Sequence, residues 1–138
     1  MKIMGIDYGD SRVGVALSDS LGFMAHGLKT VPNKVYPKML ESVVSLIKEH
    51  GVTLVVLGLP KNMDGSLGFR ADITHDFARD LKNELPDIEI VFQDERLTTV
   101  QASLYLNATN TRGASRKNVI DTVSAEIILQ SYLDSKKN

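Results

Sequence analysis

The chain has 138 residues, a formal net charge of −1 and no cysteine. This length fits one domain over residues 1–138, which buries enough surface to fold without a metal or disulfide staple. The absence of cysteine excludes disulfides, thiolate zinc sites and a thiol nucleophile. The near-neutral charge argues against a broadly basic nucleic-acid binder, so nucleic-acid binding would need a local basic patch.

The N-terminus lacks the basic and then apolar pattern of a signal peptide, and no apolar run approaches the ~20 residues of a membrane-spanning helix. We therefore expect a cytoplasmic protein with no membrane partner.

The first part of the chain predicts three short strands. Residues 2–8 and 12–18 are strand-like, and the link "GDSR" has the glycine and aspartate that tight turns favour. A third strand is expected at about 23–31. Because the first two strands are too close for a crossover helix, the three form an antiparallel meander.

The rest of the chain alternates helices with strands. Pro37 suits the first turn of a helix that stops at Gly51, and residues 52–60 form the continuous apolar run of a strand buried on both faces. The later elements are a helix at 73–85, a strand at 88–93, a helix opened by the capping pair Thr98 and Gln101, a mobile loop at 107–116 and a last helix at 117–134. Right-handed crossovers would add the later strands parallel to the first, with helices on both faces.

Asp7 is a carboxylate at the end of the first strand. Ile3 and Gly5 share its face because side chains alternate along a strand. If Gly14, Ala16 and Ser18 of the second strand lie on the same face, Asp7 sits beside almost bare backbone, where the glycines leave room for a ligand. The alternative is that Asp7 only begins the turn.

The fifth strand runs into two acids, Asp94 and Glu95, at the carboxyl edge where open α/β sheets place ligands. They point to opposite faces, so at most one joins Asp7 directly, and the spacing does not say which. The alternative is a solvated strand end whose acids pair with Arg96.

The last helix carries Asp121 in line with its apolar stripe of Ala125, Ile128 and Tyr132. A charge on a buried face requires a compensating partner. The alternative is that Asn118 caps the helix and Asp121 interacts with the helix dipole in the first turn.

Three acids at one sheet edge would repel one another unless a cation binds there. Oxygen ligands favour Mg²⁺ or Mn²⁺ over zinc, and the chemistry left to such a site is metal-activated water. No acid lies between Arg96 and Ile120, whereas that stretch contains Arg112, Arg116 and Lys117. A basic loop beside a metal site suits a nucleic-acid backbone; the alternative is a solvated loop with incidental charge.

Four motifs carry a resemblance to a known family: "GIDYGDSRVGVALSD", "VVLGLPKNMDGS", "DERLTT" and "IDTVSAEIILQSYL". In this order, and over nearly the whole chain, they resemble the YqgF (RuvX-like) family. Its members are small bacterial proteins described as nucleases of pre-16S ribosomal RNA, and earlier as Holliday junction resolvases.

The resemblance implies an α/β, ribonuclease-H-like fold: a mixed five-stranded sheet of three antiparallel strands with parallel additions, flanked by helices. It also implies that Asp7, Glu95 and Asp121 are catalytic and bind metal. Related junction resolvases place a fourth acid one helical turn after the last, where this chain has Ser124, so the number of ions, one or two, stays open. The candidate substrate-binding residues are Arg12, Arg96, Arg116 and Lys117.

The implied function is a Mg²⁺- or Mn²⁺-dependent endonuclease that processes the 5′ end of precursor 16S ribosomal RNA. Its expected partners are this RNA and the ribosome or other maturation factors, and its expected state is a monomer or weak homodimer. The alternatives are a Holliday junction resolvase acting on branched DNA and a non-catalytic RNA-binding module. An ATPase lobe with a similar phosphate hairpin would need a second lobe, and the sequence holds one hairpin of this kind.

Overall fold

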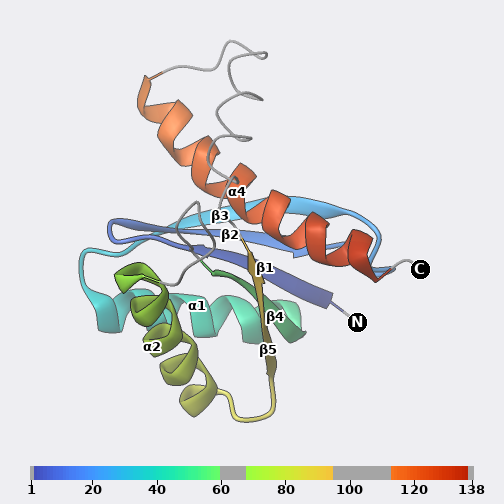
Figure 1. Ribbon diagram of the computed structural model, residues 1–138, viewed down its shortest axis with the longest axis horizontal. Coiled ribbons are helices and arrows are strands. Elements are labelled where there is room, and N and C mark those ends of the chain that lie inside the picture. Colours follow the sequence, from blue (N-terminus) through green and yellow to red (C-terminus); the bar gives the residue numbers. More distant parts are fainter. Residues whose placement is uncertain (1, 60–67, 95–112, 137–138) are drawn as a thin grey trace.

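A five-stranded sheet forms the centre of the molecule (Figure 1). The computed structural model describes residues 2–59, 68–94 and 113–136, and the side chains of residues 113–121 lie outside this description. The strands are β1 (Lys2–Tyr8), β2 (Arg12–Ser18), β3 (Ala25–Pro32), β4 (Val52–Leu59) and β5 (Glu89–Asp94), and the helices are α1 (Tyr36–His50), α2 (Phe69–Glu84) and α4 (Gly113–Ser135).

The strand order across the sheet is β3-β2-β1-β4-β5. β1, β2 and β3 pair antiparallel, whereas β4 runs parallel to β1 and β5 parallel to β4. This is the predicted mixed sheet, in which an antiparallel meander is extended by two parallel strands.

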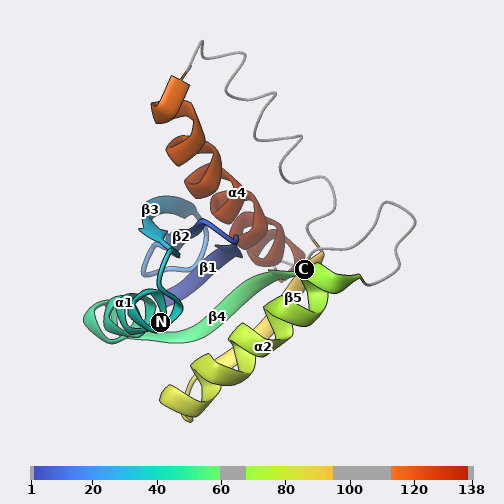
Figure 2. The ribbon, with the colours of Figure 1, turned by 90° about the vertical axis from the view of Figure 1, so that its left-hand side faces the viewer.

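Helices cover both faces of the sheet: α1 and α2 lie on one side and α4 on the other (Figure 2). The core beneath α1 and α2 includes Met4, Ile6, Val13, Val15, Val55, Leu57, Phe77 and Leu81. The core beneath α4 includes Ile3, Ala16, Leu54, Val56, Ala125, Ile128, Leu129 and Leu133. β4 contributes to both cores, as its continuous apolar sequence predicts.

Local signals set the ends of α1 as expected. Pro37 lies in its first turn, and Gly51 ends it with a φ of 64°. In this left-handed conformation the Gly51 backbone N–H bonds back to the last turn of the helix. The chain then enters β4 at once, so this cap also fixes where the central parallel strand begins.

α4 begins at Gly113, four residues before the predicted start at 117, so the prediction of a loop is wrong for residues 113–116. These residues lack large apolar side chains and therefore show no helical periodicity, although Ala114 and Arg116 are good helix formers. The third strand covers Ala25–Pro32 rather than 23–31. The helix expected to open at Thr98 and Gln101 lies outside the described residues.

β3 is an edge strand, and α4 covers part of its free edge. The backbone N–H of Ala25 donates to Gln130 Oε1 at 2.9 Å, and Gln130 Nε2 donates to the carbonyl of Phe23 at 3.0 Å. The N–H of Gly27 donates to Glu126 Oε1 at 2.7 Å. These side chains satisfy backbone groups that would otherwise be open to pairing with another chain.

Among the residues that the structure describes, no helix has the length and apolar character needed to cross a lipid bilayer.

Candidate active site

Asp7 lies near the carboxyl end of β1, half-buried, on the face of the sheet that α4 covers. Its face follows from the register, because Asp7 pairs with Gly14 and Gly5 pairs with Ala16, which belongs to the core beneath α4. Asp7 therefore shares a face with the small residues of β2, which is the condition set for it by the sequence.

The prediction that the glycines of β1 leave open room for a ligand is wrong for Gly5. A Cβ atom at this position would lie 2.7 Å from Leu129 Cβ and 2.9 Å from the carbonyl oxygen of Ala125. Gly5 lacks a side chain because α4 packs directly on its backbone. Any ligand at Asp7 therefore lies further along β1, beyond this contact.

The two candidate acids after β5 are separated by the sheet register. Leu57 pairs with Phe92 and Leu59 with Asp94, so Asp94 shares the face of Leu57, which belongs to the core beneath α1 and α2. Asp94 consequently lies on the face opposite Asp7. Glu95 is the next residue and lies outside the described part of the chain.

Asp121 lies well inside α4, whose first residue is Gly113. The alternative in which Asn118 caps the helix and Asp121 occupies its first turn is therefore wrong. Asp121 precedes Ala125, which packs on Gly5, by one helical turn. Its side chain lies outside the described residues.

Ser124 occupies the position of the fourth acid of related resolvases. It is fully buried, and within the described part of the chain its hydroxyl oxygen has no hydrogen-bond partner. A carboxylate in this buried position would require a cation or a donor.

The predicted basic residues fall into two groups. Arg12 is the first residue of β2, on the α4 side of the sheet, since the alternate residues Val13 and Val15 point into the opposite core. Arg116 and Lys117 lie in the N-terminal part of α4. Arg96 lies outside the described residues.

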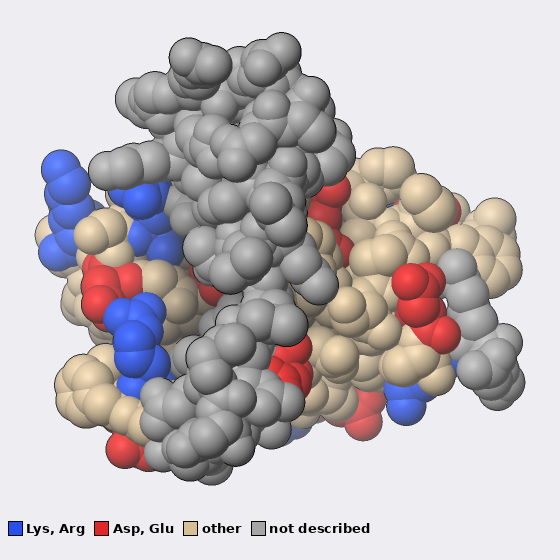
Figure 3. Space-filling view, turned by 45° about the horizontal axis from the view of Figure 1, so that its top comes forward, with Lys and Arg blue, Asp and Glu red and all other residues tan. Residues whose placement is uncertain are grey.

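Most of the lysine and arginine side chains visible in Figure 3 gather at its left side, the side on which Figure 1 draws the β1–β2 hairpin and the start of α1. A cavity of about 570 Å³ lies in this region and is lined by Ser11, Arg12, Thr30, Pro32 and Lys34. Sequence analysis did not identify Lys34 as a candidate substrate-binding residue. The position of Lys34 follows from the antiparallel pairing of Arg12 with Pro32, which brings the residues after β3 beside the hairpin.

The donor chemistry of the predicted acids fits a hard cation, because carboxylate oxygens are the ligands that Mg²⁺ and Mn²⁺ prefer. Over the described residues no group of three His, Cys, Asp or Glu side chains is arranged to hold a metal ion. Of the predicted ligands, Asp7 alone has a described side chain, and it lies at the sheet edge where the site is expected.

The order of elements, the mixed sheet and the layers define a ribonuclease-H-like α/β fold. Solved resolvases share it. RuvC from Thermus thermophilus in complex with a Holliday junction superposes with a TM-score of 0.60 at 12% identity, covering 99% of this chain and 97% of that chain. The fowlpox virus resolvase in complex with Holliday junction DNA gives 0.60 at 11% identity, covering 100% of both chains. At these identities the likeness shows the fold alone.

Comparison of the sequence with those of known proteins identifies the family of this chain. The model of the RuvX family, described as Holliday junction resolvase, matches residues 1–135. Proteins named "Putative pre-16S rRNA nuclease" are 43% identical in Acetivibrio thermocellus, over 99% of this chain and 97% of that protein, and 47% identical in Halothermothrix orenii, over 97% and 95%. The chain belongs to the RuvX (YqgF) family.

Proposed function

We propose that this protein is a metal-dependent endonuclease that processes the 5′ end of precursor 16S ribosomal RNA. The observation that carries the proposal is the position of Asp7 at the carboxyl end of β1, on the face where α4, which contains Asp121, packs against the sheet. We assign Asp7, Glu95 and Asp121 as the catalytic, metal-binding carboxylates.

The packing of α4 supports Asp121 as a partner of Asp7. α4 runs antiparallel to β3, because Ala25 bonds to Gln130 and Gly27 bonds to Glu126. A step of two residues forward along the strand therefore lies beside a step of four residues backward along the helix, and both steps cover about 6–7 Å.

β1 runs parallel to β3, so the same step applies to it. Gly5 lies against Ala125. One step further reaches Asp7 on the strand and Asp121 on the helix.

Strand alternation supports Glu95 over Asp94. Ile90 packs against the core beneath α1 and α2, and Val91 packs against the core beneath α4. Because side chains alternate along a strand, Asp94 points to the same face as Ile90. If the strand continued by one residue, Glu95 would point to the face of Asp7.

A bound Mg²⁺ or Mn²⁺, as one ion or two, would supply an activated water and stabilise the departing oxygen of a phosphodiester. The three carboxylates would hold the ion at the sheet edge, where β1 and the packed α4 would fix the backbone positions of Asp7 and Asp121. Arg12, Arg96, Arg116 and Lys117 would neutralise neighbouring phosphates and orient the strand.

The choice of substrate rests on the relatives, whose names refer to pre-16S rRNA. The second candidate, cleavage of branched DNA, is favoured by the description of the family and by the resolvase fold. Action on precursor ribosomal RNA would place the protein in the cytoplasm, with the ribosome or other maturation factors as partners.

The test is cleavage of a 5′-extended 16S precursor fragment and of a four-way DNA junction, each with Mg²⁺, Mn²⁺ or EDTA. Asp7→Asn, Glu95→Gln and Asp121→Asn should each abolish metal-dependent cutting. Asp94→Asn is the matched control, since it removes the adjacent charge from the opposite face, and it should cut like the wild type. Unchanged cutting by the first three variants would refute the assigned site, and cutting of the junction alone would select the resolvase.

A further inference from the structure

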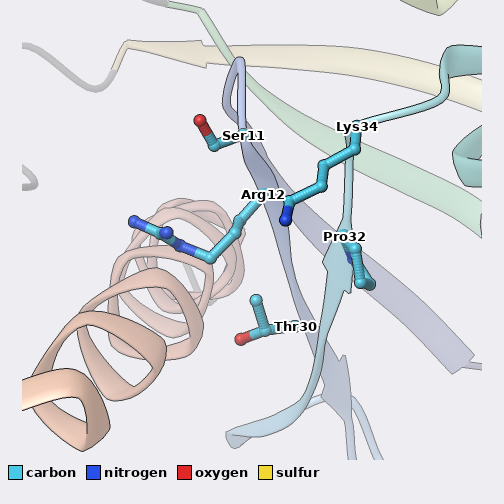
Figure 4. A pocket seen from close by; sticks show the side chains of 5 residues that line it. All are labelled: Ser11, Arg12, Thr30, Pro32 and Lys34. Atoms are coloured by element: carbon cyan, nitrogen blue, oxygen red, sulfur yellow. The ribbon is translucent and has the colours of Figure 1, made fainter.

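The cavity beside the β1–β2 hairpin has the chemistry of an anion site. Figure 4 shows its five lining side chains, from both sides of the hollow, with the Lys34 ammonium group directed into the space between the strands. Arg12 and Lys34 supply two positive charges, and Ser11 and Thr30 supply hydroxyl donors. Among the residues that the structure describes, none of those lining the cavity is acidic.

The nearest acid of the hairpin loop already has a cation. Asp10 directly precedes Ser11, and its Oδ2 accepts from Arg70 Nη1 of α2 at 2.5 Å. The loop therefore adds little uncompensated negative charge beside the cavity.

The two walls of the cavity are tied together. Asn33, between Pro32 and Lys34, donates its backbone N–H to the carbonyl of Ser11 at 2.8 Å and its side-chain amide to the carbonyl of Gly9 at 2.8 Å. The hairpin and the connection from β3 to α1 are thereby held in one arrangement, which reduces the entropic cost of ordering them around a ligand.

The cavity lies on the same face of the sheet as Asp7. Thr30 pairs with Gly14, and Gly14 pairs with Asp7, so these three residues form one row across the strands. Two strand spacings separate Thr30 from Asp7, a distance of about 10 Å. A nucleic-acid strand with one backbone phosphate at Asp7 would therefore have a neighbouring part of its backbone within reach of the cavity.

We infer that the cavity formed by Ser11, Arg12, Thr30, Pro32 and Lys34 binds a backbone phosphate of the RNA strand whose scissile phosphate lies at Asp7. This rests on the proposed function for the identity of the ligand. In this assignment Lys34, Ser11 and Thr30 bind the phosphate together with Arg12. The cavity thus fixes the position of the strand a short way from the bond that is cut.

The test measures binding separately from cleavage. Asp7→Asn protein is titrated with a labelled 5′-extended precursor RNA in EDTA over a range of salt concentrations, alone and with Lys34→Gln or Arg12→Gln added. Each added substitution should weaken binding roughly three- to tenfold and reduce the slope of log K against log salt by about 0.7, the value for one phosphate contact on a single strand.

Lys48→Gln is the matched control, because Lys48 is an exposed lysine in the last turn of α1, on the opposite face of the sheet. It should leave the slope unchanged, and Lys34→Arg should restore it. Circular dichroism verifies that each variant is folded.

Slopes for Lys34→Gln and Arg12→Gln equal to that of Lys48→Gln would overturn the phosphate site, whatever the wild type cleaves. Reduced slopes together with no cleavage by the wild type would support the site and count against the proposed nuclease. The two ideas can therefore fail independently.

Discussion

Replacing Gly5 with alanine tests how closely the candidate site depends on the packing of α4. The new Cβ would lie 2.7 Å from Leu129 Cβ and 2.9 Å from the Ala125 carbonyl oxygen. Carbon atoms pack best at about 3.5–4.0 Å, so α4 has to move away from β1 by about 1 Å. The contact includes helix backbone, which cannot rotate away as a side-chain end can.

The stability cost is moderate. Overpacking a core typically costs about 1–3 kcal/mol, and alanine gains roughly 0.5–1 kcal/mol over glycine within a strand. The net loss of about 1–2 kcal/mol lowers Tm by roughly 3–10 °C in a chain of this size. A domain stable by about 5–15 kcal/mol stays folded at 25 °C.

The effect on activity should be larger than the effect on folding. A displacement of about 1 Å between groups that bind one reacting centre costs about 100-fold in rate. The Gly5→Ala protein should therefore be folded by circular dichroism yet cut precursor RNA about 100-fold more slowly. Assays run well below its Tm, at saturating Mg²⁺ or Mn²⁺, separate the two effects.

Gly27→Ala is the control. Its Cβ would meet Glu126 Oε1 at 2.8 Å and Thr122 Cβ at 3.1 Å, so the closest atom is the end of a flexible side chain. It should retain activity within a few-fold. Wild-type rates for Gly5→Ala, or an equal loss for Gly27→Ala, would refute the argument that α4 positions the site through Gly5.

Three further predictions concern stability and assembly. Burial, and then the hydrogen bond from the Tyr36 hydroxyl to Asp80 Oδ2 at 2.6 Å, raise the pKa of Tyr36 above its ordinary value of 10.0. The protonated Tyr36 hydroxyl therefore stabilises the fold below pH 10, and this stabilisation is lost as the pH rises further. Urea unfolding midpoints measured from about pH 9 to about pH 11 should fall more steeply for the wild type than for Tyr36→Phe. Parallel curves would contradict this. Ser124→Ala removes a fully buried hydroxyl without a partner among the described residues and should leave the free energy of unfolding unchanged or raise it by about 1 kcal/mol; a clear loss would reveal a partner. The double variant Glu126→Ala, Gln130→Ala uncovers the edge of β3 and should self-associate in sedimentation velocity where Glu49→Ala does not, and a monomeric double variant would show that the edge is protected in another way.

Much of the fold was predictable because its signals are local. Two strand-like segments joined by a tight turn predict the hairpin, and a proline and a glycine mark the two ends of α1. The start of α4 was missed because residues 113–116 have no large apolar side chain and so lack the apolar spacing that reveals a helix. Helix propensity gives a partial signal here, from Ala114 and Arg116, because Gly113 and Ser115 are weaker helix formers.

The candidate site needed information that a single strand does not contain. That Asp94 lies opposite Asp7 follows from the pairing of Leu57 with Phe92, a contact between distant segments. Gly5 was misread for a similar reason. Its missing side chain is visible in the sequence, but the sequence does not show that a helix more than a hundred residues later fills the space.

One row of small residues explains why stability and the proposed chemistry depend on the same contact. Gly5, Ala16 and Gly27 pair across three strands and present almost no side chain to α4, so the helix packs close to the sheet. The next row, Asp7, Gly14 and Thr30, lies one step further along the strands and leads to the basic cavity. In the proposed site, backbone contacts in the first row would thus set the distance between Asp7 and the backbone of Asp121 on α4. A site that must hold a cation between a strand and a helix gains from this arrangement, because rigid backbone positions its ligands more accurately than flexible side chains do.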